Sequence, residues 1–345
     1  MRFFTPEPLE GVHLYPLFYF RFAPHMQVGG LFREHLPQNY FEAKAEYVES
    51  PEAADAILLP NNFSIFNDAV REYIAKYADL GESLGKPVFI FACSDLSSDF
   101  VFDPRVYVFR YSIYRSQMGT RDISTPTLAT DLGREGVVLR EKFVIPTVSF
   151  CGKAGFGSPR ETLASWVKRL PIEMKGILNP KARAKIRGVF WRRWVLNACV
   201  HSSRIKTLFI LRKSFSGASQ TIELDPAQAR KEFIDSIKNA DFVLAPKGDG
   251  NYSNRFLEAL SMGRIPVHID TDAVLPFEDK IEYSKMVVTV PMDDLKNTPR
   301  YIRDFYDALS PEEFALRQKL AREVFETHLK QDSFWSAYFA SFKAI

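Results

Sequence analysis

Short apolar runs of strand length alternate with amphipathic stretches along most of this chain, and this alternation constrains the fold more than any other feature. In the first half, apolar runs lie at 56–59, 87–92 and 105–110, and a helix-spaced stretch at 69–80 ends before Gly81. Strand, helix and strand in turn are typical of an α/β domain with a parallel sheet. We also predict a buried strand at 12–20.

A second series of strand and helix patterns starts near residue 146. Strand-like runs lie at 147–151, 207–211, 241–244, 265–269 and 286–290, with helical spacing at 161–170, 229–239, 253–262, 311–327 and 334–342. Because 345 residues exceed what one hydrophobic core usually serves, we predict two domains. The prediction is an α/β fold with two Rossmann-like, doubly wound domains and an inter-domain cleft. We assign residues 1–146 and 147–325 to these domains and 326–345 to a C-terminal helix that closes back on the first.

Composition excludes several classes of protein. A net charge of +3 is too mild to indicate a nucleic-acid partner. Cys93, Cys151 and Cys199 form neither a disulfide framework nor a Cys-x-x-Cys metal site, which favours a reducing compartment. No apolar run approaches the roughly 20 residues that cross a bilayer, and the N-terminus lacks the apolar region of a signal peptide. We therefore expect a cytoplasmic protein.

The segment 241–279 carries the clearest chemical signal. A strand runs into a glycine-containing loop with Gly248, and a helix begins near Ser253. A helix N-terminus presents unpaired N–H groups and a positive dipole end, which suit a diphosphate. Ser253 and Asn254 can cap the helix or donate to phosphate oxygens, and Arg255 offers a planar cationic fork.

Glu258 lies three residues after Arg255, so both side chains fall on one helix face. A carboxylate one turn inside a helix that points at phosphates can accept hydrogen bonds from ribose hydroxyls. The competing interpretation is a surface ion pair between the two residues.

This segment closely resembles the exostosin family of glycosyltransferases. The matching motifs are Pro246-Lys247-Gly248, Asn254-Arg255, Glu258-Ala259-Leu260, Gly263-Arg264-Ile265-Pro266-Val267 and Leu275-Pro276-Phe277-Glu278-Asp279, with weaker echoes at 50–60, 109–110, 146–152 and 209–212. The resemblance implies a GT-B fold, sugar transfer with inversion, Arg212 and Arg255 facing the donor diphosphate, and Glu258 holding the ribose. The donor-binding residues that we predict are Gly152, Arg212, Lys247, Gly248, Ser253, Asn254, Arg255 and Glu258.

Two departures from related enzymes limit which properties of the family can be assigned to this chain. Members that polymerise animal heparan sulfate carry a further GT-A domain, which this chain is too short to hold. Many GT-B donor sites have a second acid eight residues before the ribose glutamate, where this chain has Gly250. We interpret Asp270 and Asp272 as loop acids and expect no metal, because the helix dipole and arginines can neutralise the leaving diphosphate.

Inversion needs a general base on the acceptor side. Asp95 is the first candidate, because it follows the carboxyl end of a predicted strand, where α/β sites form. A helix cap is its competing interpretation. His25 is the second candidate, and Glu34 and His35 are further ones.

Arg110 and Arg115 flank a Tyr- and Ser-rich stretch that can line the acceptor side, since aromatic rings pack on sugars and arginines suit anionic ones. The alternative interpretation is that the tyrosines of this stretch are half-buried residues at the edge of the sheet.

The stretch 168–194 is the most basic part of the chain, with nine Lys or Arg against one acid, Glu173. Trp191 and Trp194 are interleaved with these charges, so the stretch can rest on anionic lipid at the inner face of the membrane. A solvated linker leading into a helix is the competing interpretation.

We predict an inverting glycosyltransferase that moves a sugar from a nucleotide-sugar donor, UDP-sugar first and GDP-sugar second, to a glycan or lipid-linked acceptor in polysaccharide or glycoconjugate synthesis. The alternative is a non-catalytic nucleotide-sugar or glycan-binding subunit of a transferase complex. A Rossmann oxidoreductase is disfavoured, because Gly152, Gly155 and Gly157 do not fit Gly-x-Gly-x-x-Gly.

Overall fold

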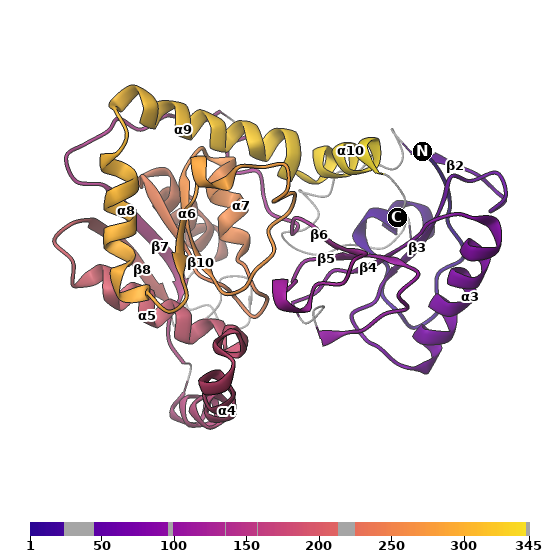
Figure 1. The fold of residues 1–345 in the computed structure, drawn as a ribbon. Coiled ribbons are helices and arrows are strands. Elements are labelled where there is room, and N and C mark those ends of the chain that lie inside the picture. The colour runs from indigo at the N-terminus through magenta and orange to yellow at the C-terminus, as the bar shows by residue number, and fades with distance from the viewer. Residues whose placement is uncertain (24–44, 96–98, 135, 157, 213–224, 343–345) are drawn as a thin grey trace. The chain divides into compact units, whose positions relative to one another are not determined.

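A computed structural model describes residues 1–23, 45–95, 99–134, 136–156, 158–212 and 225–342 (Figure 1). The chain divides into two compact units, each assembled from segments that are distant in sequence. The first unit contains Met1–Leu128, Val274–Phe277 and Thr327–Ile345, and the second contains Ala129–Ala273 and Glu278–Glu326. Residues 129–146, which precede the second sheet, belong to the second unit.

The first unit is built on a parallel sheet with the strand order β2-β1-β3-β4-β5-β6 among the described residues. Its elements are β1 (Arg2–Phe4), η1 (Pro16–Phe18), α1 (Tyr19–Phe22), β2 (Glu46–Tyr47), β3 (Ala56–Asn62), α3 (Asp68–Leu84), β4 (Val88–Ala92), β5 (Tyr107–Arg110), η3 (Arg115–Gln117), β6 (Asp122–Ser124) and α10 (Gln331–Ser341). The predicted strands at 56–59, 87–92 and 105–110 are confirmed as β3, β4 and β5. Because β1 lies between β2 and β3, the direction of winding reverses there, as in a doubly wound sheet.

The predicted strand at 12–20 is wrong. That segment forms η1 and α1, and only Leu14 makes a β-bridge, to Asn61. Pro16 stands at the first position of η1, where its fixed φ suits a helical turn and its missing N–H costs nothing.

Helix α3 runs past the predicted end at Gly81. Its start is capped by Asn67, whose side chain accepts a hydrogen bond from the Val70 N–H over 3.0 Å. It ends at Gly85, which has a left-handed φ of 64°. Gly81 is instead a packing position, because a Cβ there would collide with the Val88 side chain.

Helix α10 packs on the first sheet through aromatic rings. Trp335 lies edge-on to Phe109 at 4.8 Å and to Phe91 at 5.7 Å between ring centroids. Its indole N–H donates to Gln331 over 3.0 Å, so the buried polar atom is satisfied. The last helix therefore contributes core to the unit that contains the N-terminus.

The second unit is built on another parallel sheet, with the strand order β11-β10-β9-β7-β8 in the described part of the chain. Its elements are β7 (Thr147–Lys153), α4 (Pro159–Leu178), η4 (Pro180–Lys185), α5 (Gly188–Val200), β8 (Lys206–Arg212), α6 (Pro226–Lys238), β9 (Phe242–Ala245), α7 (Asn254–Ser261), β10 (Ile265–Asp270), η6 (Tyr283–Lys285), β11 (Val288–Pro291), η7 (Leu295–Asn297), α8 (Thr298–Asp307) and α9 (Pro311–Val324), and η8 (Phe325–Leu329) follows α9. Every strand predicted from 147 to 290 is confirmed. The two Rossmann-like, doubly wound units establish the predicted α/β fold class.

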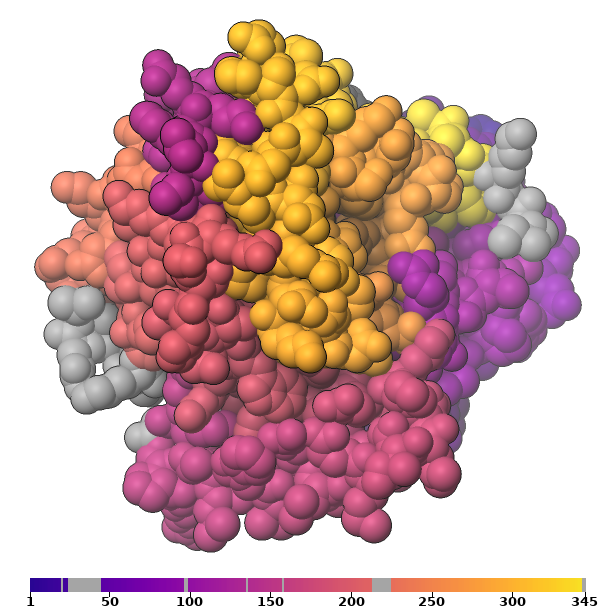
Figure 2. Space-filling model, turned by 60° about the vertical axis from the view of Figure 1, so that its left-hand side comes forward, coloured from indigo at the N-terminus to yellow at the C-terminus, as the bar shows by residue number. Residues whose placement is uncertain are grey.

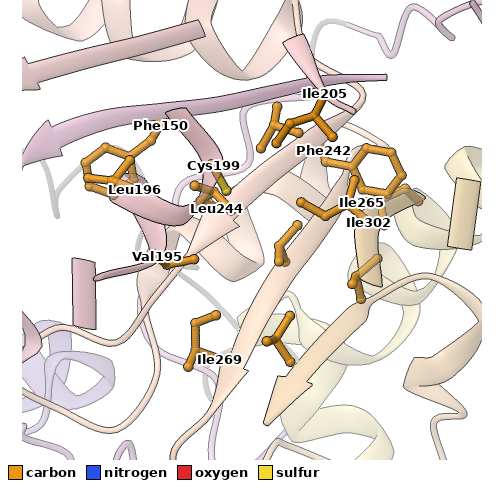
Figure 3. Packing of buried hydrophobic residues seen from close by; sticks show 14 of the residues in the cluster. Phe150, Val195, Leu196, Cys199, Ile205, Phe242, Leu244, Ile265, Ile269 and Ile302 are labelled. Atoms are coloured by element: carbon orange, nitrogen blue, oxygen red, sulfur yellow. The ribbon is translucent and has the colours of Figure 1, made fainter. Parts of the chain in front are cut away.

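Helices cover both faces of the second sheet. On one face, alternate residues of β7 and β9 such as Phe150 and Leu244 pack against α5 and α8, as Figure 3 shows for Val195 and Ile302. On the other face, Val243 packs with residues of α6 and α7. A two-residue period that alternates between the faces produces this layering.

The stretch 168–194 is not a solvated linker, because it belongs to α4, η4 and α5. Trp191 is buried and donates its indole N–H to the carbonyl oxygen of Ile186 over 3.0 Å. Trp194 is half-buried beside it. Within the described ranges, every helix is too short or too polar to cross a lipid bilayer.

Candidate functional site

The winding of the second sheet reverses between β7 and β9. The first strand of this unit, β7, pairs with β8 on one side and with β9 on the other. In open parallel sheets, ligands bind outside the carboxyl ends of the strands at such a switch point. Helix α7 follows β9 after the loop 246–253, so its N-terminus reaches this position.

Arg255, in the first turn of α7, bridges the switch point. Its Nη2 donates to the carbonyl oxygen of Cys151 in β7 over 2.8 Å, and its guanidinium lies 4.4 Å from the ring centroid of Phe150. The first turn of α7 is thereby joined to the carboxyl end of β7, although the two residues are 104 positions apart in sequence.

The guanidinium of Arg255 is desolvated and only partly paired. Burial, followed by the charge of Arg192, lowers its pKa to about 10, against the opposing effect of Glu258. The group is still protonated at neutral pH. Its Nε and Nη1 are buried and have no hydrogen-bond partner among the described residues. A buried cation with free donors is costly, so it indicates a place for an anion.

Gly152 is required by the position of Arg255. A Cβ on Gly152 would stand 2.9 Å from the Arg255 Nη2, and the Gly152 φ is 152°. Without a side chain, the strand end leaves room for the guanidinium.

Arg212, the last residue of β8, supplies a second guanidinium at this edge. Its Nη2 donates to the Ala229 carbonyl over 3.0 Å and to Glu232 over 3.1 Å, both in α6. Its Nε and Nη1 are buried and lack partners in the described part of the chain. Arg212 and Arg255 are both close enough to affect the Cys151 thiol. Burial raises the pKa of this thiol, and the positive charges of the two arginines partly oppose that shift.

Glu258 lies one turn after Arg255 and faces α6. Its carboxylate accepts from Arg230 Nη1 over 3.3 Å. Burial raises the pKa of Glu258, and the charges of Arg230 and Arg255 oppose the shift. The carboxylate is therefore held in a buried position with cations on two sides.

Sequence reasoning missed two members of this cluster, Arg192 and Arg230. Arg192 lies in α5, and its Nη1 donates to the carbonyl oxygen of Lys153 at the end of β7 over 3.2 Å. In the sequence, Arg192 stands out only as one of the cations of the basic stretch 168–194. Arg230 lies in an amphipathic helix, where a surface cation is the usual interpretation, and no sequence signal connected it with Glu258.

The loop before α7 is fixed by packing against α5. A Cβ on Gly188 would collide with the carbonyl oxygens of Lys247 and Gly248. Lys247 is buried, and its Nζ donates to the Ala184 carbonyl over 2.7 Å. Lys247 thus anchors the loop, and its contact with the donor stays a prediction.

The remaining donor candidates lie at the start of α7. Ser253 caps the helix, because its Oγ accepts from the Arg255 N–H over 3.3 Å. Asn254 is exposed on the first turn. Gly248 is half-buried, and a Cβ there would stand 3.4 Å from Arg192 Nη2.

The acceptor-side candidates lie in the first unit. Asp95 is exposed, three residues beyond the carboxyl end of β4. Arg110 is buried and donates to Asp122 over 2.6 Å and to the Phe100 carbonyl over 3.0 Å, whereas Arg115 is exposed at the start of η3. His25, Glu34 and His35 fall outside the described residues.

Asp270 is the last residue of β10 and not a loop residue, whereas Asp272 lies in the loop that follows. Asp272, with a φ of 61°, lies 3.5 Å from Lys181 Nζ. Among the residues that the structure describes, no group of three or more His, Cys, Asp and Glu side chains comes together as metal ligands.

Four guanidinium groups therefore gather with two carboxylates at the carboxyl edge of the second sheet: Arg192, Arg212, Arg230 and Arg255, with Glu232 and Glu258. A net positive, partly desolvated cluster beside a helix N-terminus can bind a diphosphate, and Glu258 can accept hydroxyl groups. The fold and this cationic edge define the class of Rossmann-like α/β proteins.

Residues 115–305, more than half of the chain, match the model of the Exostosin GT47 domain. The chain belongs to that family of glycosyltransferase domains. It is similar to Exostosin-1 of Drosophila melanogaster, 33% identical over 118 residues that cover 34% of this chain and 13% of that protein. It is also similar to the probable beta-1,4-xylosyltransferase IRX10L of Arabidopsis thaliana, 35% identical over 88 residues that cover 26% of this chain and 20% of that protein. The matches thus span only a small part of these relatives.

Among solved structures, the chain is similar to a glycosyltransferase from Rickettsia africae ESF-5, with a TM-score of 0.38 and 10% identity over 98% of this chain and 97% of that one.

Proposed function

We propose that this protein is an inverting glycosyltransferase that uses a nucleotide-sugar donor, UDP-sugar first and GDP-sugar second. The proposal rests on one observation above all. Arg212 and Arg255 each keep Nε and Nη1 buried without a partner in the described residues, at the switch point of a Rossmann-like unit. Membership of the Exostosin GT47 domain family supports sugar transfer as the reaction.

In this proposal, the donor diphosphate accepts hydrogen bonds from Arg212, Arg255 and the N-terminus of α7. Hydrogen bonds from a guanidinium group to a phosphate are stronger than bonds between neutral groups. They become stronger still as negative charge develops on the oxygen that leaves the anomeric carbon. Arg192 adds positive charge beside Arg255. The site therefore favours the diphosphate as a leaving group.

Glu258 is proposed to hold the ribose. Its buried carboxylate already accepts from Arg230, which leaves the second oxygen for hydroxyl donors. Burial raises the pKa of Glu258 because its carboxylate has lost hydrogen bonds from water. Ribose hydroxyls that donate to the carboxylate would replace those hydrogen bonds and stabilise its charged form.

The transfer step that we propose is a single displacement. The acceptor hydroxyl oxygen attacks the anomeric carbon from the face opposite the diphosphate, and a general base takes the hydroxyl proton. The bond from the anomeric carbon to the diphosphate oxygen breaks, and its electron pair leaves with the nucleoside diphosphate. Asp95 is our candidate base, with His25 second, and the arginine cluster takes the role that a metal has in other transferases.

We place the reaction in the cytoplasm, in the synthesis of a polysaccharide or glycoconjugate, with a glycan or lipid-linked acceptor. The test is release of nucleoside diphosphate from a panel of UDP- and GDP-sugars, with slow donor hydrolysis as the readout when no acceptor is present. Release that disappears in Arg255→Met supports a transferase. Nucleotide binding without any release, with glycan acceptors also supplied, would assign the chain to the alternative, a non-catalytic nucleotide-sugar-binding subunit.

A further inference from the structure

Helix α4 of the second unit carries its apolar residues on the solvent side. The exposed members are Leu163 at 68%, Trp166 at 49%, Val167 at 57%, Leu170 at 60%, Met174 at 70%, Ile177 at 82% and Leu178 at 92% relative exposure. At about 100° of rotation per residue, these positions fall within roughly a third of the helix circumference. A helix normally buries such a stripe, so an exposed stripe indicates a surface that binds another molecule or a membrane.

The two acids of α4 lie outside this stripe and are paired with cations. Glu173 lies 2.6 Å from Arg169 and 3.2 Å from Arg183. Glu161 lies 3.6 Å from both Lys153 Nζ and Arg187 Nη2. These two are the only acids in the helix, so the outward face carries none.

The helix is firmly attached in this orientation. Arg187 donates to the buried Oγ of Ser165, and the Trp166 ring lies edge-on to Phe190 of α5 at 5.3 Å between centroids. Gly176 lets the Arg183 stem of η4 lie directly on the helix. In Figure 1, α4 lies beyond α5, outside the layers of the second unit, and Figure 2 shows the segment around it forming one margin of that unit.

Basic side chains lie along one side of the stripe. Arg160, Lys168 and Lys175 are exposed and make no ion pair within the described ranges. An apolar stripe bordered by cations and free of acids is the chemistry of a helix that lies in the surface of an anionic bilayer. A second copy fits less well, because a two-fold interface would bring the same three cations together from both chains.

We propose that α4 docks this protein on an anionic lipid bilayer, with the apolar stripe inserted among the headgroups and the adjacent cations on lipid phosphates. The face that we assign is therefore the stripe Leu163–Leu178. Trp191, which suggested lipid contact from sequence, is buried and takes no part. This inference does not rest on the donor site.

The experiment is cosedimentation of the full chain with vesicles, either pure phosphatidylcholine or phosphatidylcholine with phosphatidylglycerol. We expect binding to the anionic vesicles only, weakened by added salt. The double variant Lys168→Gln/Lys175→Gln should bind about 25-fold more weakly, since each cation near an anionic surface contributes about fivefold. Leu170→Glu should weaken binding on the order of tenfold or more.

The matched control is Leu316→Glu, which changes an equally exposed leucine, 60% accessible, on helix α9. It should bind vesicles like the parent chain. All of these positions are exposed, so unchanged melting temperatures verify that the variants fold. Equal binding to neutral and anionic vesicles, or no binding to either, would overturn the proposal. A dimer that Leu170→Glu dissociates would then assign the stripe to a second copy of the chain.

Discussion

Arg255 Nη2 donates to the carbonyl oxygen of Cys151 over 2.8 Å, which ties the first turn of α7 to the carboxyl end of β7. That bond uses one nitrogen of the guanidinium and leaves Nε and Nη1 directed away from any partner in the described chain. The relationship explains why Arg255 is ordered without being neutralised. A charge that is held in place before the ligand arrives costs little to organise when it binds.

Removing Arg255 should abolish nucleotide binding while leaving the fold intact. In Arg255→Met no carboxylate loses its partner, because Glu258 keeps Arg230, so the free energy of unfolding should stay within about 1 kcal/mol of the parent. Urea denaturation measures this.

The matched control is Arg264→Met. Burial also lowers the pKa of Arg264 to about 10, but Arg264 donates to the carbonyls of Met262, Val138 and Lys238. Its loss leaves these acceptors unpaired and should cost roughly 3 kcal/mol. Equal losses in both variants would contradict a binding role for Arg255.

Gly152→Ala should impair the site through sterics alone. The new Cβ would press on Arg255 Nη2 at 2.9 Å, in a backbone conformation that L-residues rarely adopt. We expect a loss of about 1 kcal/mol or more in stability and a loss of nucleotide-induced stabilisation. Gly155→Ala is the control, since a Cβ there meets nothing within 4 Å. If both variants bind nucleotide like the parent, Gly152 does not shape the site.

Glu258 should make stability fall as pH rises. Burial raises its pKa in the folded state above the ordinary 4.5, so the folded protein holds a proton that the unfolded chain releases first. Its stabilising contribution is complete below pH 4.5 and is lost as pH rises through the raised pKa. Thermal melts of the parent and Glu258→Gln from pH 4 to 8 measure this. The two curves should diverge toward high pH, with the Gln variant relatively more stable, and a constant difference would show that Glu258 does not titrate as assigned.

Asp95→Asn should separate chemistry from donor binding. A lost general base lowers turnover by a factor on the order of 10² to 10⁴. Nucleotide-induced stabilisation should be unchanged, because the arginine cluster is built entirely from residues 129–273 of the second unit. Asp99→Asn, also exposed in the same connection, is the control. Full turnover in Asp95→Asn would remove it as the base.

Helix α7 could be predicted from sequence because its signals are local. The strand, the loop, the Ser253 cap and the Arg255–Glu258 spacing all lie within twenty residues and agree with one another. The longer strands of both parallel sheets could likewise be predicted from their apolar runs. By contrast, β1, β2 and β6 have only two or three residues each, too few to show a period.

The partners in the site could not be predicted, because they are set by tertiary contacts. Arg192 reaches the end of β7 only because α5 packs beside the loop at Gly248, through a contact between Gly188 and that loop. Arg230 meets Glu258 across two helices that are separate in sequence. In α4, the sequence shows an amphipathic helix, but only packing determines that its apolar stripe is left exposed.

The most direct test of the central claim is the melting temperature with UDP, GDP and uridine, for the parent chain and for Arg255→Met. Because a ligand that binds only the folded state adds about 2.7 kcal/mol at one hundred times its Kd, a clear upward shift is expected with UDP in the parent. Uridine, which lacks the diphosphate, should give little shift, and Arg255→Met should give none with any of the three. An equal shift with uridine, or a full UDP shift in Arg255→Met, would contradict a diphosphate site at this arginine.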